Sequence, residues 1–344
     1  MIQADLFLHA AYTIFVPMKT PVDIWAELGA RLSSFGQDAA SREVIARACQ
    51  KNDWFEPEEI VDAVRSIREE FLSRDKIERW LACYERPATL LSRTVLVVMA
   101  GNIPLVGFFD LLCVLASGHA CRVKPSSKDT VLIGYVVDLL RTIDPAIPLR
   151  MAEQGERLDA VIATGSDNAN RYFRMLFGGI PSLLRGSRQS VAVLSGRETA
   201  AELSGLEEDI FAYSGLGCRN VSLLFLPRGY MPELRCTALN EKYRRNYLRE
   251  RALLRMCRMP FVDLDGAVLC EDRSFPAALS RIHYTFYDSL ADVEAWLAAH
   301  DDRLQCVVSQ CVRHSRRVAF GRAQHPGLTD YADDVDTMRF LGTI

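Results

Sequence analysis

The sequence has no excess of either charge, few histidines and no apolar run long enough to cross a membrane. It contains 41 lysines and arginines against 44 acidic residues, so neither nucleic acid nor an acidic membrane surface is expected as a partner. The longest apolar stretches, 94–100 and 103–118, are shorter than the roughly 20 residues that a bilayer requires. The start of the chain also lacks the basic segment and apolar core of a signal peptide. We therefore expect a soluble, cytoplasmic protein without a membrane span.

Cysteine patterns typical of metal sites or disulfide frameworks are missing as well. No two of the 10 cysteines are spaced Cys-x-x-Cys, and most lie in apolar runs such as 111–114 and 305–308. The six histidines are scattered along the chain. We expect free thiols in a reducing compartment and no bound metal.

The first quarter of the chain is predicted to be helical. Apolar residues recur there at three- and four-residue spacing, as in the run 58–72. Pro57, followed by two glutamates, predicts a helix start with Asp53 as its N-cap. We see no catalytic pattern in this region, and interpret 1–90 as a helical N-terminal region that packs or forms an oligomer surface.

Strands and helices alternate from residue 94 onward. The β-branched run 94–100 predicts a buried strand, and 120–124 and 159–163 predict two more, each followed by a helix. This alternation is typical of a doubly wound parallel sheet, which binds ligands at the carboxyl ends of its strands. The sequence thus predicts an α/β fold. We expect a nicotinamide cofactor-binding domain over 91–188, a second α/β catalytic domain over 189–325, and a C-terminal oligomerisation tail over 326–344.

Polar residues follow each of the predicted strands. Asn102 follows the first, where its amide could donate a hydrogen bond to an oxyanion or simply form the turn. Lys124 ends the second, where it could bond a ribose or phosphate or lie on the surface. Ser126 and Ser127 are expected to cap the helix that follows.

The third predicted strand leads into Gly165 and Ser166, which begin a helix. Helix starts offer unpaired N–H groups to a pyrophosphate. The spacing Gly-x-Gly-x-x-Gly is absent here, so the usual dinucleotide fingerprint is missing.

Cys218 differs from the other cysteines because glycines flank it. Gly215 and Gly217 permit close approach of the backbone to a substrate, and Arg219 supplies a charge that favours a thiolate. A nucleophile and a small core residue beside a turn are both compatible with this pattern.

The order of these motifs resembles the aldehyde dehydrogenase superfamily. Within it the sequence is most similar to the acyl-CoA reductase branch, which includes the fatty-acyl reductase of bacterial luminescence systems. The resemblance covers about 90–344 and is carried by MAGNIPLVGFFDLLCVLASGH (99–119), RVKPSSKDT (122–130), IATGSDNANRYF (162–173), RQSVAVLSGRET (188–199), FAYSGLGCRNVS (211–222) and FGRAQHPGLTDYADDVDTMRFL (320–341).

The resemblance implies a role for each matching residue. Cys218 corresponds to the thiol that attacks an acyl carbonyl, and Asn102 to the side-chain donor of the oxyanion hole, beside the Cys218 backbone N–H. Lys124 corresponds to the lysine that binds the adenine-side ribose. Gly165 and Ser166 correspond to the loop that receives the pyrophosphate.

Two departures from the superfamily pattern refine this expectation. Leu184 stands where aldehyde-oxidising members carry a glutamate base, so water is not expected to hydrolyse an acyl-enzyme efficiently. Ser127, between Ser126 and Lys128, stands where NAD-preferring members often hold a glutamate against the ribose. We expect NADPH as cofactor, with NADH as the alternative.

The resemblance implies an acyl-CoA reductase that forms an aldehyde through an S-acyl cysteine. The acyl thioester would come from acyl-CoA or from a partner protein, and the chain is expected to form a homo-oligomer. One alternative is an aldehyde dehydrogenase that produces acid, with a carboxylate such as Glu198 as base. Another is a non-catalytic scaffold with the same fold.

Overall fold

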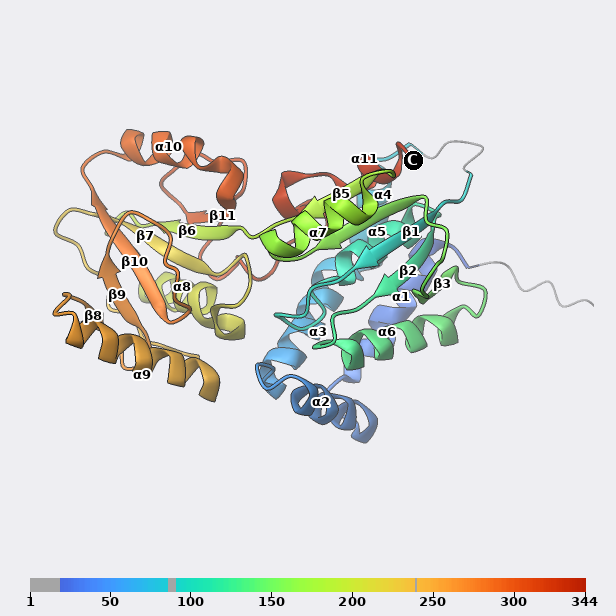
Figure 1. Ribbon diagram of the computed structural model, residues 1–344, viewed down its shortest axis with the longest axis horizontal. Coiled ribbons are helices and arrows are strands. Elements are labelled where there is room, and N and C mark those ends of the chain that lie inside the picture. Colours follow the sequence, from blue (N-terminus) through green and yellow to red (C-terminus); the bar gives the residue numbers. More distant parts are fainter. Residues whose placement is uncertain (1–18, 86–90, 239) are drawn as a thin grey trace, which may run out of the picture.

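Two separate sheets organise the chain into two lobes (Figure 1). The computed structural model describes residues 19–85, 91–238 and 240–344. Strands in the first sheet follow the order β3-β2-β1-β4-β5, and those in the second follow β12-β11-β6-β7-β10-β9-β8. The predicted α/β class, with two α/β units and a helical N-terminus, is confirmed. No helix in the described ranges is both long and apolar enough to cross a bilayer.

The first sheet is entirely parallel. Its strands are β1 (Thr94–Val98), β2 (Ala120–Lys124), β3 (Leu149–Met151), β4 (Ala160–Thr164) and β5 (Ser182–Arg185). Because β1 lies between β2 and β4, the loops after these three strands meet at the carboxyl edge of the sheet. That edge is where open parallel sheets bind ligands.

Helices cover this sheet and share its core. The connecting helices are α5 (Phe108–Ala116), α6 (Thr130–Ile143) and α7 (Asp167–Phe177); the N-terminal ones are α1 (Pro21–Arg31), α2 (Ala39–Lys51), α3 (Pro57–Phe71) and α4 (Arg74–Leu81), with a 3-10 turn over Leu32–Ser34. Trp25 of α1 and Ile60 of α3 pack in one core with Phe108 of α5. The N-terminal helices are therefore part of the first lobe.

Two predicted helix caps are wrong. Glu56, not Asp53, is the N-cap of α3, because the helix begins directly at Pro57. Helix α6 begins at Thr130, with Asp129 as N-cap. Ser126 instead closes a turn before the helix, since its hydroxyl accepts a hydrogen bond from the Lys128 N–H at 3.3 Å.

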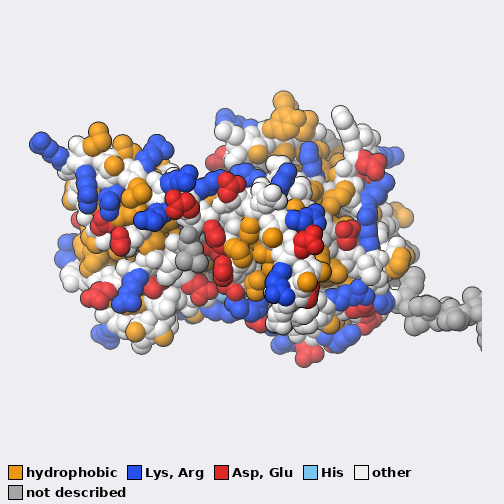
Figure 2. Space-filling view, turned by 90° about the horizontal axis from the view of Figure 1, so that it is seen from below, with side chains coloured by type: hydrophobic (Ala, Val, Ile, Leu, Met, Phe, Trp, Pro, Cys, Tyr) orange, Lys and Arg blue, Asp and Glu red, His pale blue; other side chains and the backbone are white. Residues whose placement is uncertain are grey.

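The second sheet is parallel except for the pairing of β8 with β9. Its strands are β6 (Gln189–Val193), β7 (Val221–Pro227), β8 (Val262–Asp263), β9 (Val268–Glu271), β10 (Arg281–Tyr287), β11 (Leu304–Ser309) and β12 (Arg317–Val318). The helices of this lobe are α8 (Ala200–Phe211), α9 (Glu241–Met256) and α10 (Leu290–Ala299), with 3-10 turns over Ala212–Gly215 and Asp301–Arg303. On the face in Figure 2, basic and acidic side chains are interspersed over both lobes.

The C-terminal segment returns to the first lobe, where α11 (Thr337–Leu341) lies near α5 (Figure 1). A 3-10 turn over Ala332–Asp334 precedes it. Tyr331 and Leu341 are buried in the first core, and the Trp80 indole donates a hydrogen bond to the Tyr331 hydroxyl at 2.8 Å. The predicted tail thus packs on its own chain, and its part in oligomerisation stays a prediction.

Candidate active site

Cys218 lies in the loop between the 3-10 turn Ala212–Gly215 and strand β7. The side chain of Asn220 fixes this loop: its Oδ1 accepts from the Gly217 N–H at 2.8 Å, and its Nδ2 donates to the Ala212 carbonyl at 2.9 Å. Ser190 Oγ also donates to the carbonyl of Cys218 at 3.0 Å. The backbone that presents the thiol is therefore held on both sides.

The Cys218 side chain is reachable by solvent although protein surrounds it closely. That surrounding protein raises the pKa of the thiol, because it disfavours the charged form. The neighbouring Arg219 lowers this pKa, and Asp333 raises it. The thiol therefore needs a proton acceptor to become a nucleophile near neutral pH.

Asn102 lies against the same loop. Its Nδ2 donates a hydrogen bond to the Leu216 carbonyl at 2.6 Å, which joins the loop after β1 to the one that carries Cys218. A second N–H of the amide remains for another acceptor. The structure thus brings together the residues predicted as nucleophile and oxyanion donor.

The loop after β1 is anchored by buried polar groups. Asn52 Nδ2 donates to the Gly101 carbonyl at 3.2 Å, and Asp129 Oδ2 accepts from the Leu105 N–H at 2.8 Å. Leu105 has a φ of 57°, a conformation that is strained for a bulky residue. Burial raises the pKa of Asp129 to about 7. Asp129 therefore stabilises a strained turn close to Asn102.

A mostly apolar cavity of about 170 Å³ opens beside Cys218. Helix α3 contributes Ala63, Ser66, Ile67 and Phe71 to its wall. Residues 103–106 and 108–109, after β1, form another part. An acyl chain attached to Cys218 would find apolar surface there.

Polar side chains interrupt this apolar wall, among them Ser66, Gln305 and Gln324. The Nε2 atom of Gln324 is buried without a hydrogen-bond partner among the described residues, and the whole residue is only 9% exposed. The Ser66 hydroxyl lies 3.1 Å from Nδ1 of His325.

The predicted cofactor residues lie at the carboxyl edge of the first sheet. Lys124 ends β2 and is exposed, as is Ser127. Ser126 packs against Gly101, where an added Cβ would lie 2.6 Å from the serine Cβ. These residues therefore border the loop that carries Asn102.

Gly165 and Ser166 follow β4 on the other side of β1. Ser166 is the N-cap of α7, and its hydroxyl accepts from the Ala169 N–H at 3.3 Å. The predicted helix start is confirmed, whereas binding of a pyrophosphate there stays a prediction.

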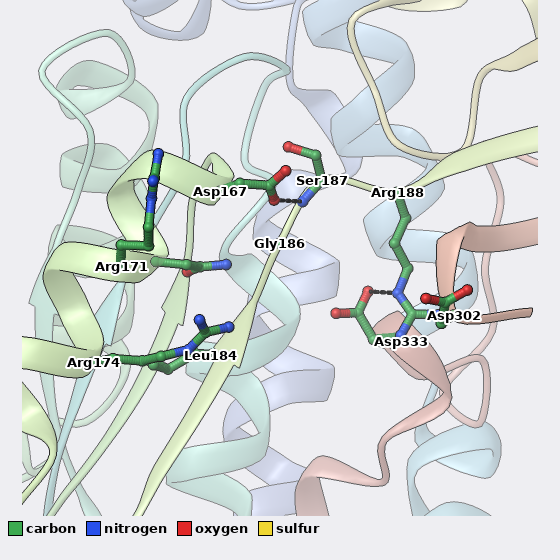
Figure 3. A pocket seen from close by; sticks show the side chains of 10 residues that line it. Asp167, Arg171, Arg174, Leu184, Gly186, Ser187, Arg188, Asp302 and Asp333 are labelled. Carbon is green, nitrogen blue, oxygen red and sulfur yellow. Dashed lines mark hydrogen bonds and ion pairs between the residues drawn. The ribbon is translucent and has the colours of Figure 1, made fainter. Parts of the chain in front are cut away.

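Leu184 lines a second cavity of about 430 Å³ between α7 and the C-terminal segment (Figure 3). Its other walls are mainly charged, and Arg188 forms an ion pair with Asp333 at 3.1 Å. Figure 3 also shows Arg171 and Arg174 projecting from α7 toward this space. Leu184 therefore lines a different cavity from Cys218, and its correspondence to the base of aldehyde-oxidising members stays a prediction.

Comparison with known protein families identifies the chain. The family model "Acyl-CoA reductase (LuxC)" matches residues 33–236. The chain belongs to the LuxC acyl-CoA reductase family. No curated protein sequence matches it at a significant level.

Solved structures similar to this LuxC-family chain are aldehyde dehydrogenases. Aldehyde dehydrogenase 21 from Physcomitrella patens, solved with succinate, has a TM-score of 0.64 at 10% identity over 93% of this chain and 83% of its own. An acetylating aldehyde dehydrogenase from Geobacillus thermoglucosidasius has a TM-score of 0.62 at 10% identity, covering 93% and 89%. The Bacillus cereus enzyme, solved with NAD+, has a TM-score of 0.60 at 12% identity, covering 86% and 72%. At these identities the similarity establishes the fold.

Sequence reasoning missed the cavity wall that helix α3 supplies to this LuxC-family chain. Its cavity residues Ala63, Ile67 and Phe71 follow the same spacing as any helix that packs on a core. No local sequence pattern marks Gln324, although it lies within the matching segment 320–341. Among the described residues, no group of three or more His, Cys, Asp or Glu side chains is arranged to hold a metal ion.

Proposed function

We propose that this LuxC-family chain reduces an acyl thioester to an aldehyde through an S-acyl intermediate on Cys218. The observation that carries the proposal is the meeting of three features: an accessible thiol, the Asn102 amide against its loop, and an apolar cavity beside it. These are the groups that acyl transfer to a thiol requires.

The residues at the carboxyl edge of the first sheet fit a nicotinamide cofactor. Lys124 and the N-terminus of α7 offer a cation and backbone N–H groups on either side of β1. Ser127 and Lys128 are exposed, whereas the nearby Asp129 is buried and bonded to the Leu105 N–H. Because the Asp129 carboxylate is held inside the protein, it does not repel a ribose 2′-phosphate beside Ser127 and Lys128, which favours NADPH over NADH.

The chemistry of acylation follows from the loop geometry. The Cys218 thiolate attacks the thioester carbonyl, and the oxyanion accepts hydrogen bonds from the free N–H of Asn102 and from the Cys218 backbone. The bond of Asn102 to Leu216 fixes the amide before substrate arrives, so little reorganisation is needed. The thiol of the substrate leaves and the acyl group remains on Cys218. When bound, the cofactor supplies the hydride that converts this thioester to an aldehyde.

Leu184 supports reduction over hydrolysis. Without a carboxylate at this position, a water molecule near the acyl-enzyme lacks the base that aldehyde oxidation to acid would use. Glu198, the alternative base named above, binds the Ser195 and Gly196 backbone N–H groups instead. That engagement favours a structural role for Glu198.

The acyl donor is acyl-CoA or a thioester carried by a partner protein, and we propose that the enzyme acts as a homo-oligomer. The decisive experiment measures NADPH and NADH oxidation with a panel of acyl-CoAs while trapping the aldehyde. Cys218→Ala should abolish acyl-dependent oxidation, and Cys257→Ala, at another exposed cysteine, should not.

Three results would contradict the proposal. Equal activity of the Cys218→Ala variant would remove the thiol from the reaction. Release of acid from an aldehyde, with no aldehyde formed from any acyl-CoA, would favour the dehydrogenase alternative. Failure of Cys218 to become acylated, together with no nucleotide affinity, would favour a scaffold.

A further inference from the structure

Three side chains from distant parts of the sequence form a hydrogen-bonded chain that ends at the apolar cavity. Ser66 of α3 lies with its Oγ 3.1 Å from Nδ1 of His325, and Nε2 of His325 lies 3.2 Å from Oε1 of Glu208 in α8. Ser66 lines the same cavity as Cys218. A serine, an imidazole and a carboxylate in this order can move a proton.

The surroundings of His325 fix which ring nitrogen carries the proton. The Glu208 carboxylate can only accept, so the neutral imidazole donates from Nε2 and accepts from the Ser66 hydroxyl at Nδ1. The hydrogen bond from His325 lowers the pKa of Glu208, so its carboxylate remains charged near neutral pH. The ring can therefore take a second proton at Nδ1, because the negative charge of Glu208 stabilises the imidazolium that forms.

The Cys218 thiol requires a proton acceptor, and the side chains of Ser66, His325 and Glu208 can provide one. Burial disfavours its thiolate, and by the resemblance Leu184 stands where aldehyde-oxidising members carry their carboxylate base. Arg219 and Asp330 are the charged residues in the cavity wall. Asp330 Oδ2 already accepts a hydrogen bond from the Gly327 N–H at 2.7 Å, so this carboxylate holds its own loop.

We propose that Ser66, His325 and Glu208 form a proton relay that removes the proton from Cys218. The thiol proton passes to a water in the cavity, that water gives a proton to Ser66 Oγ, and the hydroxyl proton of Ser66 moves to His325 Nδ1. The products are a thiolate, an intact water and serine, and an imidazolium paired with Glu208. A cavity of about 170 Å³ has room for such a water, which needs roughly 10–15 Å³.

In the reductase the same relay runs in reverse. The proton held on His325 returns through Ser66 to the thiolate that leaves the acyl thioester, so one proton is conserved over acylation. This reverse step rests on the function proposed above. The removal of the thiol proton does not, because it precedes any substrate.

Other charged groups act on both ends of the relay. Asp209 lies near His325, and the charges of Arg65 and Arg322 act on Glu208. The groups that act on Cys218 are Arg219, Asp333, Arg185 and the buried thiol Cys306. Variants that test the relay must therefore leave these other charged residues in place, so that a shift in the Cys218 titration can be assigned to the relay.

The test follows alkylation of Cys218 by iodoacetamide as a function of pH, without substrate or cofactor, by mass spectrometry of the intact protein and its peptides. His325→Gln keeps a polar side chain that cannot accept the proton. We expect it to move the midpoint of alkylation upward, with the rate near pH 7 falling about tenfold for each pH unit of that shift. At high pH, where the thiol ionises unaided, the rates of variant and wild type should converge.

Two further variants sharpen this test. Ser66→Ala should shift the midpoint in the same direction, because it interrupts the path to the imidazole. His314→Gln is the matched control: His314 also faces a carboxylate, that of Asp301 at 3.3 Å, but lies in the second lobe outside the cavity. Its alkylation profile should match that of the wild type.

The relay is refuted if the profile of His325→Gln matches the wild type, or if Asp330→Asn, and not His325→Gln, shifts the midpoint. A merely structural role for His325 would lower the thermal unfolding midpoint and leave the alkylation profile unchanged. A shifted profile in a protein that reduces no acyl-CoA would uphold the relay and overturn the proposed function. An unchanged alkylation profile in a protein that does reduce acyl-CoA would overturn the relay and leave the proposed function standing.

Discussion

The buried ion pair between Asp110 of α5 and Arg185 of β5 provides a quantitative test of how the first lobe is held together. Nη1 of Arg185 donates to both carboxylate oxygens at 2.6 and 2.5 Å, and Nη2 donates to Thr337 Oγ1 at 2.7 Å. The side chains are 5% and 7% exposed. The pair therefore joins a helix, an edge strand and the C-terminal segment away from solvent.

Replacing Asp110 with alanine leaves the Arg185 charge buried without its partner. Such a loss costs about 3–5 kcal/mol, a large fraction of the roughly 5–15 kcal/mol that stabilises a typical protein. At about 1.4 °C for each kcal/mol in a chain of 344 residues, we expect the unfolding midpoint to fall by roughly 4–7 °C. Differential scanning calorimetry and urea unfolding would measure the change.

Two controls separate burial from the mere loss of an ion pair. Asp288→Ala removes an equally well aligned partner of Arg228, at 2.7 and 2.8 Å, but these side chains are 68% and 69% exposed. Its expected cost is within about 1 kcal/mol. The double variant Asp110→Ala/Arg185→Met removes the buried charge as well and should recover most of the lost stability. Equal costs for both single variants, or no recovery in the double variant, would refute the reasoning.

Three smaller predictions concern packing and titration. Gly205→Ala in α8 should lower the free energy of unfolding by about 1–3 kcal/mol, since the new Cβ would lie 2.8 Å from the Gly321 backbone N. Gly134→Ala in α6 meets nothing within 4 Å and should raise that free energy by roughly 0.5–1 kcal/mol. Urea unfolding of both variants measures these changes, and a change of the opposite sign in either variant would contradict the prediction. Gln324→Leu removes a buried amide N without a partner and should raise stability by about 1 kcal/mol, so a measured loss would contradict that assignment. Burial raises the pKa of Asp209 from 3.8 to about 7, so its contribution to folding is complete below pH 3.8 and is lost as pH rises through about 7. Asp209→Asn should flatten the fall in unfolding free energy over that range, and an unchanged slope would argue against it.

The inner strands of the first sheet were predicted well from the sequence. Strand β2 has the predicted bounds, and β1 ends only two residues before its predicted end, because β1 is an unbroken apolar run and β2 buries alternate residues. Strands β3 and β5 were missed because they are short and partly exposed at the sheet edges. Strand β10 was missed although its alternation of polar and apolar residues is itself a strand signal.

The candidate site was predictable only where a motif carried it. Cys218 and Asn102 stand out through their flanking residues, and the resemblance to a family places both in one site. The hydrogen bond from Asn102 to Leu216, in the loop of Cys218, joins residues 114 positions apart and has no local sequence signal. No local pattern marks Ser66, which is 259 positions from His325. Its place in the cavity depends on how α3 packs against the loop after β1, and that is a property of the folded chain.

Buried carboxylates link these observations, because each holds a loop that borders the cavity. Asp129 holds the strained Leu105 turn, and Asp209 accepts from the backbone N–H groups of Gly321 and Ala323, just before Gln324. Glu59 of α3 faces the backbone of Tyr213, which has a φ of 53° in the turn before Cys218.

Burial raises the pKa of these three carboxyls, Glu59, Asp129 and Asp209, to about 7. Their ionised forms are therefore costly, and the backbone N–H groups that they hold offset part of that cost. Loops with strained residues need such support to keep one conformation. Since Glu59 lies on the same helix as Ser66, α3 supports the thiol loop, lines the cavity and supplies the first residue of the proposed relay.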